Sequence, residues 1–208
     1  ERTTVHAEAI AKRLDTYEEM LRGGSGLYNA SNDVTKEDWQ QFVGSFEIPT
    51  RYPGVQGLGY AKYMKPSDRQ TVISYMQNQG IADFTIRPAE PHRDIYTAII
   101  YLEPLDERNK LAIGYDMFSE SVRRRAMEQA RDTGTAAISD RVELVQGGSN
   151  KAEFYGFLMY LPRYNNGMPR ETVEQRQAAI DGFVYAAFRS EDLFNGIFSE
   201  ADNEEVGF

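Results

Sequence analysis

Apolar side chains recur along the first 22 residues with the period of an amphipathic helix. They lie three to five positions apart and share one face: Val5, Ile10, Leu14, Tyr17 and Leu21. The glycine-rich segment 23–26 follows and predicts that the helix ends at about Arg22. Two roles remain open for this apolar face, packing on the helix's own domain and pairing with a second copy of the chain near a membrane.

A second helix is predicted to begin at Thr35, which has the spacing of a capping box with Asp38. Apolar residues then follow at helical intervals: Trp39, Phe42, Val43 and Phe46. This spacing is typical of a helix face packed on a core. We therefore expect the only tryptophan of the chain to be a packing anchor rather than a platform for a ligand.

Strands and short helices alternate along the rest of the chain. Strands are predicted at 55–63, 84–87, 96–102, 111–117, 136–138, 141–145, 154–161 and 182–188. Helices are predicted from Ser67 to Gly80, from Ser119 to about 132, at 172–179 and at 191–198. This order predicts an α+β fold with antiparallel strands, arranged as in PAS-like domains.

Two glycines stand on one face of the predicted strand 55–63. Gly57 and Gly59 remove side chains from that face, while Leu58 and Tyr60 occupy the other. The missing side chains leave two possibilities open. The glycines either allow another part of the chain to pack closely or form part of a cavity floor.

Composition favours a folded protein and argues against several functions. Hydrophobic residues make up 41% of the 208 and aromatic residues 12%, and the net charge of −9 opposes binding to nucleic acid. The one basic run, Arg123–Arg125, is expected to be a solvated helix face. There is no cysteine, and the two histidines, His6 and His92, share no evident scaffold, so we expect no metal site, no cofactor and no catalytic triad.

Three separated motifs occur in one order in the middle of the chain: Arg93–Tyr96, Gly114–Asp116 and Ala130–Gly134. Further segments flank them, upstream at Tyr52–Val55 and Gly57–Tyr60, and downstream at Gly156–Leu158 and Gly182–Val184. Together they resemble a CHASE domain over most of the chain. CHASE domains are extracytoplasmic ligand-binding domains of transmembrane receptors, among them histidine kinases and nucleotide cyclases.

The resemblance implies a stalk helix and two PAS-like subdomains. The stalk helix would cover 1–26, a membrane-distal ligand-binding subdomain 27–160, and a membrane-proximal subdomain, incomplete in this chain, 161–208. A transmembrane helix is expected before Glu1, and a second one with a kinase or cyclase output domain after Phe208. The domain would then face the periplasm as part of an inner-membrane protein, and the full receptor would be a homodimer.

Asp116 is the most distinctive candidate for ligand binding. It ends the predicted strand 111–115, where a carboxylate needs a partner. It could cap the helix that is predicted from Ser119. By the resemblance, it matches the acidic residue with which plant cytokinin receptors bind the ring nitrogens of adenine. Arg93 and Asp94 could bind an acidic ligand or form an ion pair with each other, and their place just before a predicted strand favours the ion pair.

Other residues of the expected pocket follow from the same resemblance. Ala136, Ile138 and Gly156 match positions along the cytokinin pocket, and Tyr101 and Phe157 add bulk that either lines or fills it. The sequence therefore predicts a sensor that binds a small flat molecule with N–H donors, such as an adenine-type compound. The alternatives are a ligand-free ectodomain that dimerises or docks a periplasmic binding protein and, as a third option, a hydrolase.

Overall fold

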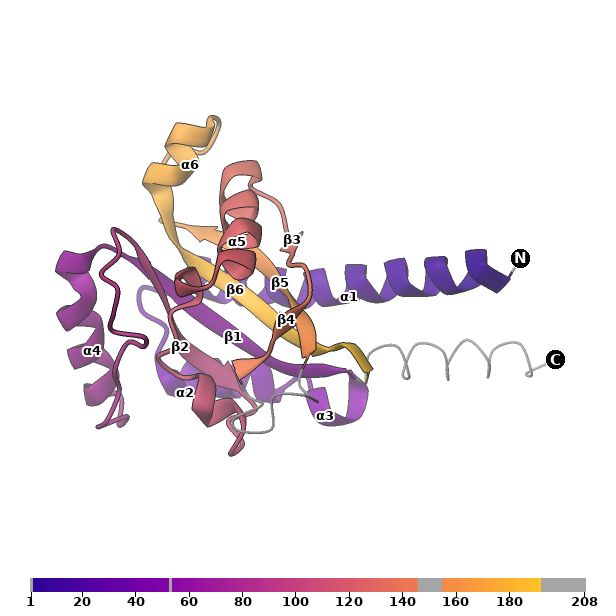
Figure 1. Ribbon diagram of the computed structural model, residues 1–208, viewed down its shortest axis with the longest axis horizontal. Coiled ribbons are helices and arrows are strands. Elements are labelled where there is room, and N and C mark those ends of the chain that lie inside the picture. Colours follow the sequence, from indigo (N-terminus) through magenta and orange to yellow (C-terminus); the bar gives the residue numbers. More distant parts are fainter. Residues whose placement is uncertain (1, 53, 146–154, 192–208) are drawn as a thin grey trace.

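A long helix and an antiparallel sheet form the fold in the computed structural model (Figure 1), which describes residues 2–52, 54–145 and 155–191, with side chains from Glu8 onward. The sheet order is β2-β1-β6-β5-β3, and β4 also pairs with β5. These strands are β1 (Val55–Met64), β2 (Tyr96–Glu103), β3 (Ala137–Ile138), β4 (Val142–Glu143), β5 (Tyr155–Tyr164) and β6 (Ile180–Arg189). All named pairs are antiparallel, so the predicted α+β class is confirmed.

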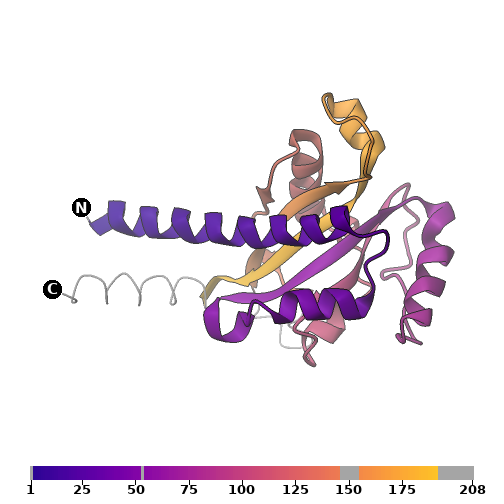
Figure 2. The ribbon, with the colours of Figure 1, turned by 180° about the vertical axis from the view of Figure 1, so that it is seen from behind.

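Helices cover both faces of this sheet. The α-helices are α1 (Arg2–Ala30), α2 (Lys36–Gly44), α3 (Ile48–Arg51), α4 (Arg69–Asn78), α5 (Ser121–Thr133) and α6 (Val173–Ala179). The described residues also form short 3-10 turns, which are η1 (Pro66–Asp68), η2 (Asn109–Ala112) and η3 (Met117–Ser119). Helix α5 crosses one face (Figure 1), and α1 runs along the other (Figure 2). We call these the α5 face and the α1 face.

The strand β6 lies at the centre of the sheet and supplies both cores. Val184, Ala186 and Phe188 belong to the cluster on the α1 face. Phe183, Tyr185 and Ala187 belong to the cluster on the α5 face. Because successive side chains of a strand point to opposite faces, a strand covered on both sides needs an almost unbroken apolar run, which β6 has.

The first helix does not end at Arg22, as the sequence predicted, but continues through the glycines to Ala30. A Cβ atom on Gly24 would lie 2.9 Å from Val184 Cγ1 and 3.1 Å from Trp39 Cη2. The glycine therefore lets α1 approach the sheet and α2 more closely than any side chain would allow. Packing on the sheet outweighs the helix-breaking tendency of the glycine run.

The second helix is as predicted. Thr35 and Asp38 form a capping box at the start of α2. Trp39 is fully buried, and its Nε1 donates to the carbonyl oxygen of Leu58 at 3.3 Å. The expectation that this tryptophan is a packing anchor is confirmed.

The predicted strands 84–87 and 111–117 were wrong. Only single bridges join Arg87 to Tyr115 and Ala98 to Asp116. Gly114 has a φ of 81°, which turns the chain between η2 and η3 and prevents a continuous ladder.

Two predicted helix caps were also wrong. Glu120, rather than Ser119, caps α5, because its carboxylate accepts from the backbone of Val122 and Arg123. Helix α4 begins after Asp68 without a side-chain cap, so Ser67 does not cap it.

The predicted boundary between two subdomains does not divide this sheet. Position 160 lies inside β5, and the strand 182–188, expected in a second subdomain, lies within β6 between β1 and β5. The described residues after 160 therefore complete the same sheet. Most of the predicted helix 191–198, and the chain beyond it, lies outside the described residues.

The two glycines of β1 pack closely and leave no cavity floor. A Cβ atom on Gly59 would lie 2.6 Å from the ring of Tyr185, which is its cross-strand neighbour. A Cβ atom on Gly57 would lie 2.7 Å from Leu102 Cδ1. Of the two possibilities, close packing is the correct one, and Gly59 makes room for the ring of Tyr185.

Candidate functional site

Asp116 is fully buried at the edge of the α5 face, and both of its carboxylate oxygens are occupied. Oδ1 accepts from the backbone N–H of Thr97 at 2.7 Å and of Phe118 at 3.1 Å. Oδ2 accepts from Arg93 Nε at 2.7 Å. The guanidinium of Arg93 also donates to the carbonyl oxygens of Pro88 and Pro91, each at 2.7 Å.

This arrangement makes Asp116 a cap, of the turn η3 rather than of α5. The predicted pairing of Arg93 with Asp94 was wrong, since Arg93 reaches Asp116 instead. A carboxylate with one charged and two backbone donors has little capacity left for a ligand. The role of Asp116 in ligand binding stays a prediction.

The other predicted pocket residues do not gather at one place. Ile138, Gly156 and Phe157 line a cavity of about 340 Å³ together with Ile10 and Leu14 of α1. Tyr101 lines a different cavity, of about 230 Å³, on the α1 face. Ala136 packs against the core of the α1 face, and Asp116 lines neither cavity.

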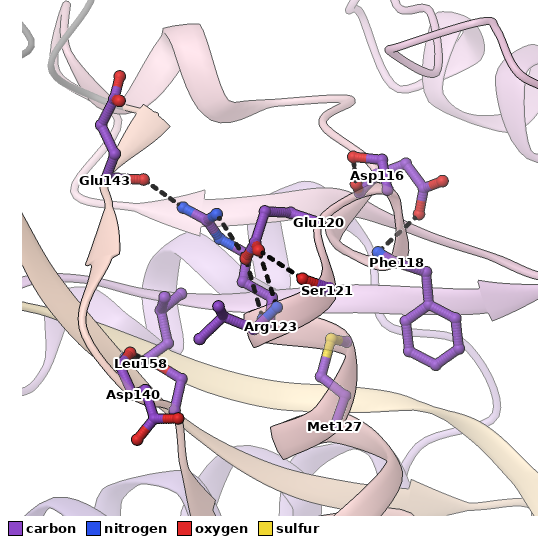
Figure 3. A network of polar contacts seen from close by, with 12 residues as sticks. Asp116, Phe118, Glu120, Ser121, Arg123, Met127, Asp140, Glu143 and Leu158 are labelled. Carbon is purple, nitrogen blue, oxygen red and sulfur yellow. Dashed lines mark hydrogen bonds and ion pairs between the residues drawn. The ribbon is translucent and has the colours of Figure 1, made fainter.

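A second buried charge lies under α5 and belongs to Arg123, which is only 4% exposed. Its Nη2 donates to the carbonyl oxygen of Glu143 at 2.5 Å, and its Nη1 lies 3.4 Å from the carboxylate of Glu120 (Figure 3). The guanidinium also lies over the ring of Tyr115, at 5.4 Å from the centroid. Compared with Arg93, Arg123 is therefore loosely paired.

Glu120 holds the start of α5 next to this cation. Its carboxylate accepts from the backbone N–H of Val122 at 2.7 Å and of Arg123 at 3.0 Å. Burial alone would raise the pKa of Glu120, but these hydrogen bonds and the nearby guanidinium outweigh burial and lower the pKa. Glu120 therefore stays ionised at neutral pH and has acceptor bonds of its own to satisfy.

Two tyrosines of the sheet carry buried hydroxyls on the same face. Tyr160 of β5 and Tyr185 of β6 are direct cross-strand partners, with ring centroids 6.2 Å apart. Neither hydroxyl has a hydrogen-bond partner among the described residues. Burial raises the pKa of both phenols, while the positive charge of Arg123 acts against that rise. The two hydroxyls therefore stay protonated and able to donate.

We call this cluster of Tyr115, Arg123, Tyr160 and Tyr185 the α5 interior. Arg123, Tyr115 and Tyr185 line a void of about 10 Å³, which is at the limit of room for one water. Unpaired buried hydroxyls cost free energy, and a guanidinium beside them is suited to a carboxylate or a similar anion. The α5 interior therefore offers donors for an anion, provided that it opens.

Sequence reasoning missed the α5 interior. It expected Arg123–Arg125 to be a solvated helix face, yet Arg123 stands three, four and seven positions before the buried residues Ala126, Met127 and Ala130. That spacing puts Arg123 on the apolar face of α5 and could have identified it. Nothing in the sequence pairs Tyr160 with Tyr185, because that requires the register of β5 and β6.

Comparison with known families identifies the class of domain. The model of the CHASE domain family matches residues 32–208. The chain belongs to this family of extracytoplasmic sensor domains of signalling receptors. No curated protein matches the chain. Among the described residues, no helix is long and apolar enough to cross a membrane.

Proposed function

We propose that this CHASE domain is the sensor of a transmembrane receptor and that a small anion, a carboxylate or a molecule that carries one, binds in the α5 interior. The receptor would be a homodimer in the inner membrane with a histidine kinase or a nucleotide cyclase as its output. The observation that supports the site is the pair of buried, unpartnered hydroxyls of Tyr160 and Tyr185 beside the guanidinium of Arg123.

Binding requires the α5 interior to open. The void of about 10 Å³ cannot admit a carboxylate, so the ligand must select a state in which the wall has moved. Such a ligand shifts the equilibrium only through its higher affinity for the open state. The long contact of 3.4 Å between Arg123 and Glu120 is the ion pair that the ligand would replace.

The central strand offers a route from this site to the stalk helix. Tyr185 faces the α5 interior, whereas Val184 and Phe188 of the same strand face α1. Phe188 packs on Tyr17 of α1 with ring centroids 4.8 Å apart. A displacement of Tyr185 would therefore reach α1 through β6, without a separate relay.

The adenine-type ligand of the sequence analysis is the competing proposal. It depends on Asp116, whose acceptor oxygens already receive donors from Arg93, Thr97 and Phe118. An adenine-type ligand would have to displace at least one of these donors. Among the described residues the hydroxyls of Tyr160 and Tyr185 have no acceptor to give up, so they favour an anionic ligand.

A thermal-shift screen tests the proposal with a panel of carboxylates (acetate, succinate, benzoate) and adenine. A carboxylate is expected to raise the melting temperature of the wild type by mass action. The double substitution Tyr160→Phe and Tyr185→Phe should abolish that rise. Tyr164→Phe is the matched control, because the hydroxyl of Tyr164 donates to the carbonyl oxygen of Arg131 at 2.5 Å, away from the α5 interior.

The other outcomes count against the proposal in different ways. Stabilisation by adenine alone would favour Asp116 as the anchor. An equal rise in wild type and double variant would place the carboxylate elsewhere. No stabilisation by any compound would favour the ligand-free ectodomain that dimerises or docks a binding protein.

A further inference from the structure

A second cavity, on the α1 face, lies apart from the α5 interior. It measures about 230 Å³, and four phenol rings take part in its wall: Tyr28, Tyr60, Tyr75 and Tyr101. Val34, Val72 and Ile100 add apolar surface. Sites for drug-sized molecules usually measure about 300–1000 Å³, so this cavity is suited to a small molecule with an apolar body.

One group of charges, two of which line the cavity, carries an excess of positive charge. Asp181 forms ion pairs with Lys62 and with Arg163, the latter at 2.9 Å, and accepts from the hydroxyl of Tyr60 at 2.5 Å. Lys62 and Asp181 both line the cavity. Two cations thus share one carboxylate, and the ammonium of Lys62 keeps donors that Asp181 does not use.

The opposite charge is supplied by Asp33, which also lines the cavity. Its oxygens accept from the hydroxyl of Tyr75 at 3.0 and 3.1 Å, and it forms no ion pair with a described residue. The hydroxyl of Tyr75 lies 3.4 Å from that of Tyr101, which itself donates to the carbonyl oxygen of Val34 at 2.8 Å. Asp33 is therefore an exposed carboxylate that Tyr75 orients and that has no cation among the described residues.

The hydroxyl of Tyr28 also indicates that a polar group can bind in this cavity. It is buried and has no hydrogen-bond partner among the described residues. Burial raises its pKa, and electrostatic interactions raise it further; they come from Tyr60, Tyr101, Asp181 and Tyr75. All four of these residues line the cavity. A buried hydroxyl without a partner costs free energy, which a bound polar group would recover.

We propose that this cavity binds a small zwitterion of the amino-acid class, with its carboxylate at Lys62, its ammonium at Asp33 and its apolar side chain against the tyrosine rings. A simple anion would leave Asp33 without a cation, and a simple amine would leave Lys62 without an added acceptor. The volume equals about seven or eight water molecules, which fits an amino acid such as leucine. This site is independent of the α5 interior.

Calorimetric titration with three compounds of one skeleton tests the class of ligand. The compounds are leucine, 3-methylbutylamine, which lacks the carboxylate, and 4-methylpentanoate, which lacks the ammonium. Leucine is expected to bind at least about tenfold more tightly than either, because each analogue loses one charge-assisted contact. Phenylalanine is titrated as a second zwitterion, so that the result does not depend on one side chain.

Two variants assign the two charged groups. Asp33→Asn should weaken leucine about tenfold and leave 4-methylpentanoate unchanged, whereas Lys62→Met should weaken leucine about tenfold and leave 3-methylbutylamine unchanged. Asp83→Asn and Lys65→Met are the matched controls, because both residues are exposed and neither lines the cavity. Melting temperatures show whether each variant is folded.

Three results would overturn the zwitterion site. They are equal binding of leucine and 3-methylbutylamine, leucine binding that survives both Asp33→Asn and Lys62→Met, and the absence of binding by both amino acids at millimolar concentration. The double substitution Tyr160→Phe and Tyr185→Phe separates the two sites, because it should leave leucine binding intact. If this double variant no longer bound leucine, the amino acid would bind in the α5 interior instead.

Discussion

The two faces of one sheet are built on different principles. On the α1 face, the helix packs on aromatic and aliphatic side chains, and a glycine brings it close enough to touch Val184 and Trp39. On the α5 face, the core includes a buried arginine and two unpartnered hydroxyls, and a buried aspartate lies at its edge. Where α1 packs on the sheet, the first face gains stability from shape, whereas the core under α5 gives up stability to keep polar groups in place.

On the α5 face, two arginines differ in how closely a carboxylate pairs with them. Arg93 and Asp116 satisfy each other at 2.7 Å with further donors around them. Arg123 donates to the carbonyl oxygen of Glu143 at 2.5 Å, but its only contact with a carboxylate among the described residues is at 3.4 Å, to Glu120, and the two nearby hydroxyls have no partner there either. Satisfied buried charges fix a structure, whereas a buried hydroxyl without a partner among the described residues calls for an explanation, and a ligand that accepts from it supplies one.

The largest expected effect is on the satisfied pair. Asp116→Ala leaves Arg93 without its carboxylate and the backbone N–H groups of Thr97 and Phe118 without an acceptor, so the free energy of unfolding should fall by about 3–5 kcal/mol. Chemical denaturation of the purified domain measures this change. Asp94→Ala is the control, because Asp94 is exposed, and it should stay within about 0.5 kcal/mol of the wild type. A mild effect of Asp116→Ala, similar to that of the control, would show that Asp116 is not a structural cap.

A smaller effect is expected on the α1 face, where the packing of α1 on the sheet depends on the shape of the contact at Gly24. Gly24→Ala adds a Cβ atom at 2.9 Å from Val184 and should cost about 1–3 kcal/mol through overpacking, partly offset by helix propensity. Gly26→Ala meets no atom within 4 Å and should gain about 0.5–1 kcal/mol. Thermal unfolding of the two variants compares them directly. Equal effects of both substitutions would mean that α1 does not depend on this close contact.

Much of the α1 face was predictable, because its features are local in sequence. The capping box of α2, the burial of Trp39 and the strand 55–63 follow from spacing within a few residues. The end of α1 was predicted wrongly, since the reason for Gly24 is Val184, which is 160 positions away. The central place of β6 could not be predicted either, because the sequence of a strand does not show which other strands pair with it.

The candidate site was less predictable than the fold. The sequence marks Asp116 as a carboxylate that needs a partner, but adjacency predicts that Arg93 pairs with Asp94, whereas Arg93 in fact pairs with Asp116, 23 positions away. As part of a basic triplet, Arg123 is predicted to lie on the surface, which is wrong. Its spacing to the buried residues Ala126, Met127 and Ala130 marks this one arginine of the three as turned inward, whereas Tyr160 and Tyr185 meet only through strand register.

The effect of acid on the α1 face should be modest and depends on Asp181. Burial alone would raise its pKa, but Lys62, the hydroxyl of Tyr60 and Arg163 outweigh burial and hold the pKa below the ordinary value of 3.8. Because the folded pKa is lowered, Asp181 contributes stability that is complete above the ordinary pKa and is lost as the pH falls below it. Asp181→Asn should therefore reduce the loss of unfolding free energy between about pH 5 and about pH 2. An unchanged pH profile would show that these ion pairs contribute nothing in solution.

The smallest expected change tests the difference between the two faces most directly, and it needs no known ligand. It is the free energy of unfolding of the double variant Tyr160→Phe and Tyr185→Phe, compared with the wild type in the absence of ligand. If both hydroxyls are kept unpaired for a ligand, their removal should leave the stability within about 0.5 kcal/mol of the wild type or raise it. A loss of about 1 kcal/mol or more for each hydroxyl would mean that both are hydrogen-bonded in the free protein, and the α5 interior would then be structural rather than a sensor site.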